Sequence, residues 1–294
     1  MSDAQRPVTV VRVRGDARAA HEDRAAVEEP LEVRLHDRPF AVIMRTPGAD
    51  RELAAGFLLA ERVIRSADEL GTVAHCTDRS ADDPADRLRQ DFGAREGGRE
   101  RDVRGENIVN VTLANGSASA IERLLADRRQ VTTNSSCGLC GRRTIESLAA
   151  DVPAIDSAWT VAAATILALP AALRARQALF DDTGGLHAAG LFARDGALVD
   201  VAEDVGRHNA VDKIVGRMLI RELLPLADHL LCVSGRTSFE IVQKAIIAGI
   251  PIVAAVSAPS SLAIDLAEEC GVTLVGFVRD DGFNIYAHPE RIET

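Results

Sequence analysis

The stretch that decides the fold is Leu230–Phe277, which reads LLCVSGRTSFEIVQKAIIAGIPIVAAVSAPSSLAIDLAEECGVTLVGF. It contains three short apolar runs with the length and β-branched content of buried strands. Two helical patterns separate these runs, and a glycine that suits a helix stop follows each of them. The strands are predicted at 230–234, 252–256 and 272–277, and the helices at 237–248 and 262–269. Because strands that alternate with helices through short links pair in parallel, we predict an α/β fold with a mainly parallel sheet.

Small polar residues fill the two turns that lead from a strand into a helix, Ser234–Ser238 and Ser257–Ser261. Thr237 and Glu240 have the spacing of a capping box at the first of these helices. Ligands collect at the carboxyl ends of parallel strands, and free N–H groups at helix N-termini suit phosphate. Simple capping also explains both turns. The candidate ligand-binding residues here are Ser234, Arg236, Thr237 and Ser257. Neither a GxxxxGK[ST] nor a GxGxxG motif occurs, so P-loop and Rossmann sites lack their signatures.

Two further segments upstream carry candidate residues. The first is 203–213, EDVGRHNAVDK, which leads into an apolar helical pattern and places Arg207 and His208 where donors can face a ligand. Asn209 and Asp212 in the same segment have the spacing of a cap and its partner. The second is 183–189, TGGLHAA, where the glycine pair suits a tight turn or a close ligand. Its His187 stands next to apolar residues and can equally be a packed side chain.

The rest of the chain predicts a smaller α+β domain over 25–131, ahead of an α/β domain over 151–294. Strands are expected at 31–36, 40–44 and 108–113, and helices from Asp50 and over 118–127. Residues 77–106 are rich in Asp, Arg and Gly and too poor in apolar residues to offset their ordering entropy, so a flexible charged insertion is predicted there. A flexible tail is predicted over 1–24 and a mobile loop over 132–150.

The composition excludes several classes of protein. A net charge of −10 over 294 residues argues against nucleic-acid binding, and 3% aromatic residues argue against a base-stacking surface. Five cysteines are too few for a disulfide framework. The N-terminus lacks the apolar run of a signal peptide, and the most apolar stretch, 158–173, is too short to span a membrane and is predicted to be a buried helix. We expect a cytoplasmic protein that binds no membrane.

Cys137 and Cys140 form the one closely spaced cysteine pair. CxxC is half of a zinc site, but a second close pair is missing. It is also a redox motif, although a polar segment precedes it instead of a buried strand. A third role is a reactive thiol on a mobile loop, where Arg142 and Arg143 favour the thiolate. A zinc deaminase would need a preceding proline and an upstream His-x-Glu, and neither is present. The spacing alone leaves the first three roles open.

Taken in chain order, seven motifs resemble the FdhD family of formate dehydrogenase accessory sulfur carriers. They are EEPLE (28–32), MRTPG (44–48), SCGLCG (136–141), TGGLHAA (183–189), EDVGRHNAVDK (203–213), SGRTSFE (234–240) and AVSAPSSLA (255–263). The resemblance runs from about residue 28 to residue 292. Two departures are Ala202, where the family often has arginine, and the long charged insertion at 77–106.

The resemblance implies a cytidine-deaminase-like α/β/α domain without the deaminase zinc, and a homodimer. It implies a sulfurtransferase in which Cys137, assisted by Cys140, accepts sulfur from a cysteine desulfurase as a persulfide. The sulfur would pass to the bis(molybdopterin guanine dinucleotide) form of the molybdenum cofactor, which formate dehydrogenase needs. The alternative function is a non-catalytic chaperone that binds this cofactor and has a structural CxxC.

The resemblance also implies where the molybdenum cofactor binds, with GDP as a mimic, and it implies no bound zinc. The cofactor-binding segment of the family falls on the residues after the third predicted strand, where ligands are also expected from the sheet topology. The full candidate set is Phe277, Val278, Arg279, Asp280, Asp281, Gly282, Ser234, Arg236, Thr237, Ser257, His187, Arg207 and His208.

Overall fold

The computed structural model describes residues 4–76, 106–114, 154–279 and 281–294. Helices and strands are mixed along the chain, which confirms the α/β class at that level. A four-stranded sheet lies within the predicted N-terminal domain, and a six-stranded sheet lies within the predicted C-terminal domain. The predicted helix at 118–127, the loop at 132–150 and all of the insertion at 77–106 except Glu106 lie outside the described residues.

The six-stranded sheet has the strand order β13-β12-β11-β10-β8-β9. Its strands are β8 (His187–Ala193), β9 (Leu198–Asp204), β10 (His229–Val233), β11 (Ile252–Ala255), β12 (Thr273–Arg279) and β13 (Gly282–Ala287). β10, β11 and β12 are the three predicted runs, and they pair in parallel as predicted. The prediction of a mainly parallel sheet is wrong, because the other three pairs, β10–β8, β8–β9 and β12–β13, are antiparallel. The links after β8 and β12 are too short for a crossover, so each of these strands forms a hairpin with the next one.

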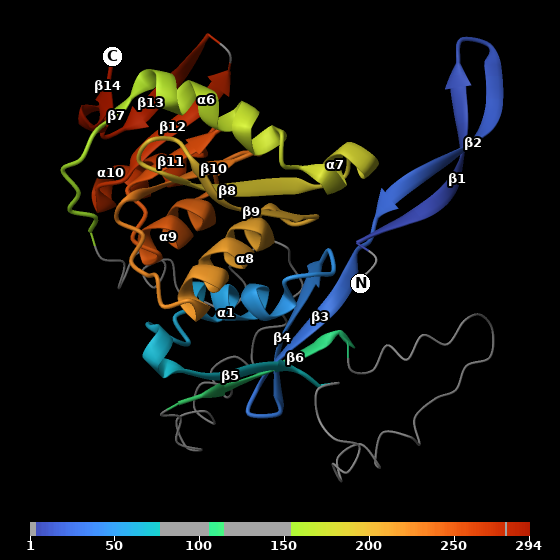
Figure 1. Ribbon diagram of the computed structural model, residues 1–294, viewed down its shortest axis with the longest axis horizontal. Coiled ribbons are helices and arrows are strands. Elements are labelled where there is room, and N and C mark those ends of the chain that lie inside the picture. Colours follow the sequence, from blue (N-terminus) through green and yellow to red (C-terminus); the bar gives the residue numbers. More distant parts are fainter. Residues whose placement is uncertain (1–3, 77–105, 115–153, 280) are drawn as a thin grey trace.

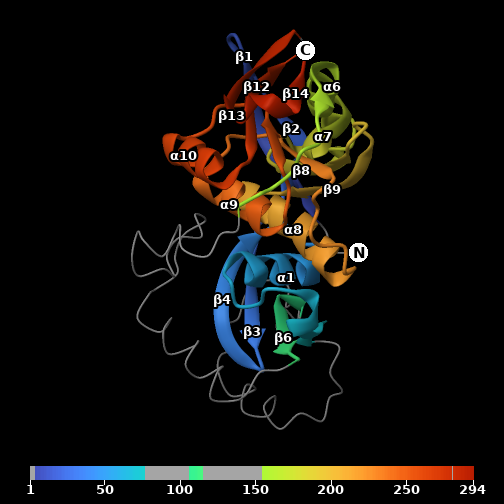
Figure 2. The same ribbon diagram turned by 90° about the vertical axis from the view of Figure 1, so that its left-hand side faces the viewer.

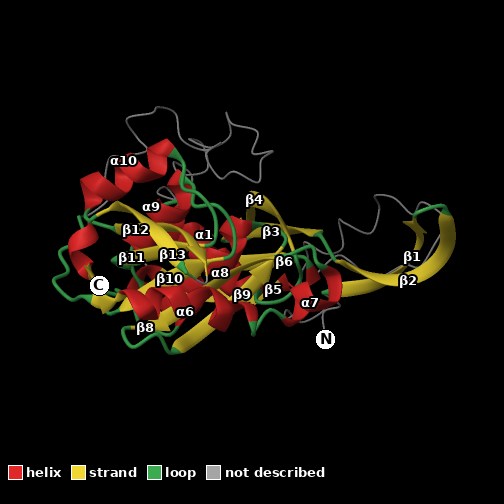
Figure 3. Ribbon diagram, turned by 90° about the horizontal axis from the view of Figure 1, so that it is seen from above, coloured by secondary structure: helices red, strands yellow, loops and turns green. Residues whose placement is uncertain are grey.

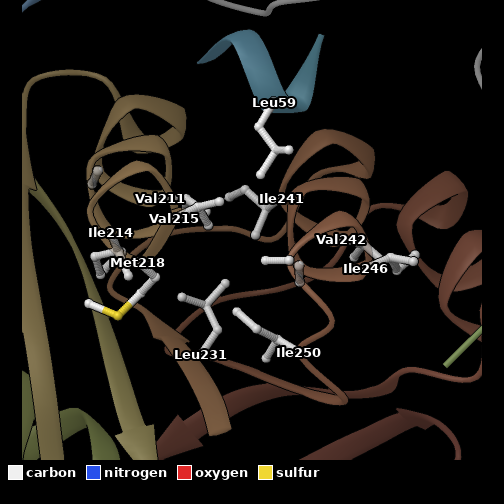
Figure 4. Packing of buried hydrophobic residues seen from close by; sticks show 14 of the residues in the cluster. Leu59, Val211, Ile214, Val215, Met218, Leu231, Ile241, Val242, Ile246 and Ile250 are labelled. Atoms are coloured by element: carbon white, nitrogen blue, oxygen red, sulfur yellow. The ribbon is translucent and has the colours of Figure 1, made fainter. Parts of the chain in front are cut away.

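Helices cover both faces of this sheet (Figure 3). On one face α6 (Ala163–Arg174) buries Ile166 and Leu169 against β8 and β10. On the other face lie α8 (Arg207–Ile220), α9 (Phe239–Ile247) and α10 (Ser261–Cys270). Figure 4 shows side chains of α8 and α9 gathered around Leu231 of β10. The helices predicted at 237–248 and 262–269, and the one expected within 158–173, are confirmed. Shorter elements are α7 (Ala178–Thr183), β7 (Val161–Ala162), β14 (Ile292–Glu293) and two 3-10 turns, η1 (Ala67–Glu69) and η3 (Pro289–Arg291).

The four-stranded sheet has the order β4-β3-β6-β5 and packs against helix α1 (Asp50–Ala60). Its strands are β3 (Glu29–Leu35), β4 (Arg38–Arg45), β5 (Leu70–His75) and β6 (Ile108–Leu113). His36 and Asp37 join β3 to β4 with positive φ angles of 48° and 67°, as a tight hairpin turn requires. The three strands predicted in this region and the helix beginning at Asp50 are confirmed, whereas β5 was not predicted.

Residues 5–26 form an antiparallel hairpin of β1 (Gln5–Arg14) and β2 (Ala17–Ala26), which extends away from the rest of the molecule (Figure 1). The prediction of a loose tail over 1–24 is therefore wrong for this part of the chain. The run from Pro7 to Val13 is rich in β-branched residues, which favour strands. Gly15, with φ of 57°, supplies the first position of the two-residue turn.

Helices α1 and α8 pack against each other and join the two larger sheets (Figure 2). A Cβ added to Gly56 of α1 would lie 2.0 Å from the backbone oxygen of Asp212. One added to Gly216 of α8 would lie 1.8 Å from that of Glu52. Glycine at both positions therefore allows the two helix backbones to approach this closely. One buried cluster includes side chains of β3, β6, α1, α8 and α9, so both sheets share a core.

Candidate functional site

The two turns that follow β10 and β11 meet each other and contact Phe277 near the end of β12. The Thr237 amide, in the turn after β10, donates to the Ala258 carbonyl oxygen at 3.2 Å, and the Ser260 amide donates to the Thr237 carbonyl at 3.0 Å. The Phe277 amide, near the end of β12, donates to the Ser257 carbonyl at 3.3 Å. The two turns lead directly into α9 and α10. We call residues 234–238 and 257–261 together with Phe277 the carboxyl-end surface.

His187, Arg207 and His208 join this surface from β8 and α8. His187 begins β8, which runs antiparallel to β10, and it lies close to the turn after β10 because a Cβ on Gly235 would be 3.3 Å from its Nδ1. Burial lowers the pKa of His187, and the positive charges of Arg207 and His208 lower it further, whereas Asp204 raises it. The fold thus brings the candidate His187 close to the candidates Arg207 and His208, about 20 positions further along the chain, and to Gly235 in the turn after β10.

The two predicted helix caps are wrong. The N-cap of α9 is Ser238 and not Thr237, because Thr237 forms a β-bridge with Pro259. The N-cap of α8 is Gly206, and Asn209 lies inside the first turn, where its side chain donates to the Met44 carbonyl oxygen at 2.8 Å. Thr237 is 1% exposed, and its hydroxyl has no hydrogen-bond partner among the described residues. The Nε atom of Arg207 is also buried without a partner in that part of the chain.

The predicted segment 277–282 divides into surface and core residues. Phe277 has a φ of 53° and is 36% exposed, and the Arg279 guanidinium lies 5.9 Å from the centre of its ring. Val278 is buried in the core on the α6 face, so its side chain does not reach the carboxyl-end surface. Asp281 is exposed and the space around Gly282 is open. Asp280 lies outside the described residues.

The other candidates in the turns after β10 and β11 differ in their exposure and in their hydrogen bonds. Ser234 is partly exposed, and its Oγ accepts a hydrogen bond from the Ala188 amide at 2.8 Å, which fixes the turn to β8. Arg236 is exposed, and Ser257 is partly exposed. The exposed Arg236 side chain can therefore turn toward a ligand, whereas the Ser234 hydroxyl is already bonded to the Ala188 amide.

The thiols predicted to carry chemistry, Cys137 and Cys140, lie outside the described residues. Cys232 is fully buried in β10, and burial raises its pKa to about 12. Burial also raises the pKa of Cys270. Both behave as small core residues, since a protonated thiol is a poor nucleophile. Within the described ranges, no three His, Cys, Asp or Glu side chains are grouped so that they could hold a metal ion.

Two buried ion pairs join elements that carry the carboxyl-end surface, and local sequence patterns did not predict them. Lys213 Nζ lies 2.6 Å from Asp204 and donates to the Thr46 carbonyl oxygen at 2.9 Å. Lys244 Nζ lies 2.6 Å from Asp212. Burial raises the pKa of Asp212, and the charge of Lys244 opposes that rise. Lys213 thus links the 203–213 segment to Thr46, and the Lys244–Asp212 pair joins α9 to α8. Each ion pair needs both partners because a lone buried charge is costly.

No helix among the described residues is long and apolar enough to cross a membrane.

Comparison with known proteins identifies the family. A family model described as FdhD/NarQ matches residues 26–293. The chain belongs to the FdhD/NarQ family. Proteins named "Sulfur carrier protein FdhD" are similar to it over most of their length. The one from Streptomyces avermitilis is 45% identical over 291 residues, covering 96% of this chain and 94% of the relative. The one from Sulfolobus acidocaldarius is 42% identical and covers 98% of both chains.

A solved structure also matches this FdhD/NarQ chain. It is described as that of a formate dehydrogenase accessory protein from Desulfotalea psychrophila. The TM-score is 0.71, and the match covers 99% of this chain and 100% of the other at 24% identity. At this identity the likeness supports the fold alone.

Proposed function

We propose that this chain is a sulfur carrier on which formate dehydrogenase depends. Cys137, assisted by Cys140, accepts sulfur from a cysteine desulfurase as a persulfide and passes it to the bis(molybdopterin guanine dinucleotide) form of the molybdenum cofactor, the substrate. The observation that carries this proposal is the similarity, at 42–48% identity, to relatives named sulfur carriers. The CxxC pair supplies the two thiols that the chemistry needs. The proposal places the protein in the cytoplasm as a homodimer.

The carboxyl-end surface supports binding of the cofactor's guanine dinucleotide part. Helices α8, α9 and α10 all begin at this surface, and their N-terminal N–H groups favour phosphate. Arg236 adds an exposed positive charge. Arg207 adds a partly buried one, and its buried Nε donor is used by no described residue. The Thr237 hydroxyl is a further unused polar group. The exposed ring of Phe277 offers an apolar face against which a base can stack.

Persulfide formation tests the proposed function directly. When the purified chain is mixed with a cysteine desulfurase and free cysteine, the peptide containing Cys137 is expected to gain the mass of one sulfur atom. The peptide containing Cys232 serves as the internal control, because a buried thiol with a pKa of about 12 should gain none. Mass spectrometry measures both peptides in one digest. An unchanged Cys137 peptide in the presence of active desulfurase would reject the proposal.

GDP binding tests the proposed position of the cofactor. Arg236→Ala is expected to weaken GDP binding about tenfold, since a hydrogen bond between charged groups contributes about 1.5–3 kcal/mol. Isothermal titration calorimetry measures the affinity. Arg221→Ala is the matched control, because Arg221 is an exposed arginine that follows the opposite end of α8. Equal affinities of the wild type and Arg236→Ala would remove Arg236 from the site.

A further inference from the structure

The β1–β2 hairpin over residues 5–26 has no part in the proposed sulfur chemistry. The match to the family model begins at residue 26, where the hairpin ends. The base of the hairpin is held to α7, where Gln5 Nε2 donates to Asp182 at 2.9 Å and Arg24 lies 3.8 Å from the same carboxylate. The part around the turn extends away from the body (Figure 1). An isolated two-stranded hairpin is only marginally stable in water, so a further strand would stabilise this one.

β1 is the apolar strand of the hairpin. It contains four valines, whereas β2 contains five alanines and no β-branched residue. Val11 and Val13 are 57% and 64% exposed, the largest values among the large apolar side chains of the described residues. An exposed, apolar edge strand is a template for pairing with another chain. The free edge of β1 is therefore a candidate interaction surface.

The hydrogen-bond pattern of the hairpin shows which residues of β1 bond to β2. Arg14 and Ala17 flank the two-residue turn and are paired with each other. The hydrogen bonds that close such a turn join these flanking residues, and bonded pairs then alternate along an antiparallel hairpin. The Val27 amide donates to the Ala4 carbonyl at 2.9 Å, which continues the same alternation to the base. The even-numbered residues of β1 therefore bond to β2.

The odd-numbered residues of β1 point their backbone groups away from β2. Pro7 is one of them and has no N–H group, and a proline within a sheet is found at such an outward-facing edge position. Thr9, Val11 and Val13 present both N–H and C=O groups. Among the described residues, no strand other than β2 pairs with β1. This edge can therefore accept a strand from another molecule.

We propose that β1 pairs in antiparallel with β1 of a second copy of this chain, with Val11 opposite the partner's Val11. The two hairpins then form one four-stranded sheet, which is long enough to be stable on its own. Pairing about a two-fold axis uses the same surface on both copies, as most homodimers do. The inference deepens the proposed function, because it rests on the homodimer but not on the sulfur chemistry.

This register satisfies both the backbone and the charges. With Val11 on the axis, the outward-facing groups of Thr9 meet those of the partner's Val13. Val11 and Val13 of both copies form one apolar cluster, since alternate residues of a strand share a face. Arg6 comes opposite the partner's Asp16, and a pair of opposite charges in this position stabilises a sheet.

The two neighbouring registers bring like charges together. An axis at Val10 would place Arg6 opposite the partner's Arg14. An axis at Arg12 would place the two copies of Arg12 opposite each other. Like charges directly opposite one another destabilise a sheet. The axis at Val11 is therefore favoured, and β1 is complementary to itself.

Disulfide formation tests the pairing and its register. Val11→Cys is expected to form a covalent dimer under mild oxidation, because Cα atoms of directly opposed residues lie about 4.5–5.5 Å apart, within the range of a disulfide. Val13→Cys is the matched control, since its two copies would be about 14 Å apart along the strands and should not cross-link. The wild type gives the background from the native cysteines. Mass spectrometry identifies the linked peptides.

A substitution at the axis tests whether this edge holds the dimer together. Val11→Glu is expected to weaken dimerisation at least about tenfold, because it removes two valines from the cluster and places two carboxylates opposite each other. Analytical ultracentrifugation of the full chain measures the dissociation constant. Val42→Glu is the matched control, because Val42 is 55% exposed on β4 and lies outside the proposed interface. Circular dichroism checks that both variants are folded.

The opposing outcomes separate this inference from the proposed function. Equal cross-linking of the two cysteine variants, or a dimer unchanged in Val11→Glu, overturns the pairing of β1 and leaves the homodimer standing. A monomeric wild type rejects the homodimer as well and would leave the edge of β1 to a different protein. Sulfur loading of Cys137, measured on the same samples, reports on the carrier function independently of all these results.

Discussion

Replacing Cys137 with alanine is expected to reduce formate dehydrogenase activity to background in cells that lack their own accessory protein. The proposed carrier holds sulfur on this thiol, and alanine offers no sulfur atom to which it can be attached. Neither Cys232 nor Cys270 can substitute, because both are buried and burial raises the pKa of each thiol. Activity in extracts of cells expressing each variant measures the effect. Cys76→Ala is the matched control, since Cys76 is a partly buried cysteine outside the CxxC pair.

Two other results would assign the cysteine pair differently. Full activity in Cys137→Ala would favour the non-catalytic cofactor chaperone. Stoichiometric zinc in the purified wild type, lost in Cys137→Ala, would indicate a structural metal site. Elemental analysis of both proteins distinguishes this case from sulfur transfer.

Gly216→Ala is expected to lower the free energy of unfolding by about 2 kcal/mol. A Cβ at this position would lie 1.8 Å from the backbone oxygen of Glu52, so α1 and α8 must move apart. Overpacking of this kind costs about 1–3 kcal/mol or more, and a clash with backbone belongs to the upper end of the range. The gain in helix propensity from glycine to alanine, about 1 kcal/mol, offsets only part of this cost.

Urea unfolding measures the effect, and the chain offers a matched glycine. A Cβ on Gly185 would meet its nearest atom, the Ala26 Cβ, at 3.7 Å, which is an ordinary contact. Gly185→Ala should therefore leave the unfolding midpoint nearly unchanged. A Gly216→Ala variant as stable as the wild type would show that the contact between α1 and α8 adjusts without cost.

The strands that could be predicted are those whose apolar runs are buried on both faces, such as β10 and β11. The strands β8, β9 and β13 were not predicted, and because they pair in antiparallel they make the sheet a mixed one. The β1–β2 hairpin was missed because its charged residues mask a run of β-branched residues, and almost all of it is exposed. Hydrophobic burial, which makes strands detectable in a sequence, contributes little to this hairpin.

The candidate site was predictable at the level of segments but not of individual contacts. The turns after β10 and β11 do lie together, as their position after parallel strands predicts. The capping box at Thr237 failed because a tertiary contact with the neighbouring turn occupies its backbone, and the cap moves to Ser238. His208 and Glu240 are 32 positions apart, so no local spacing could indicate that they touch.

The buried cluster shared by the two sheets has a consequence for how this protein can evolve. Domains that recombine between proteins usually have their own cores and meet where few contacts cross. Here the helix that contributes His208 to the carboxyl-end surface also contributes Gly216 to the contact with α1. A different N-terminal half would have to reproduce the shape of α1 before the C-terminal half could fold around it. The two halves are therefore expected to fold as one unit and not to act as interchangeable modules.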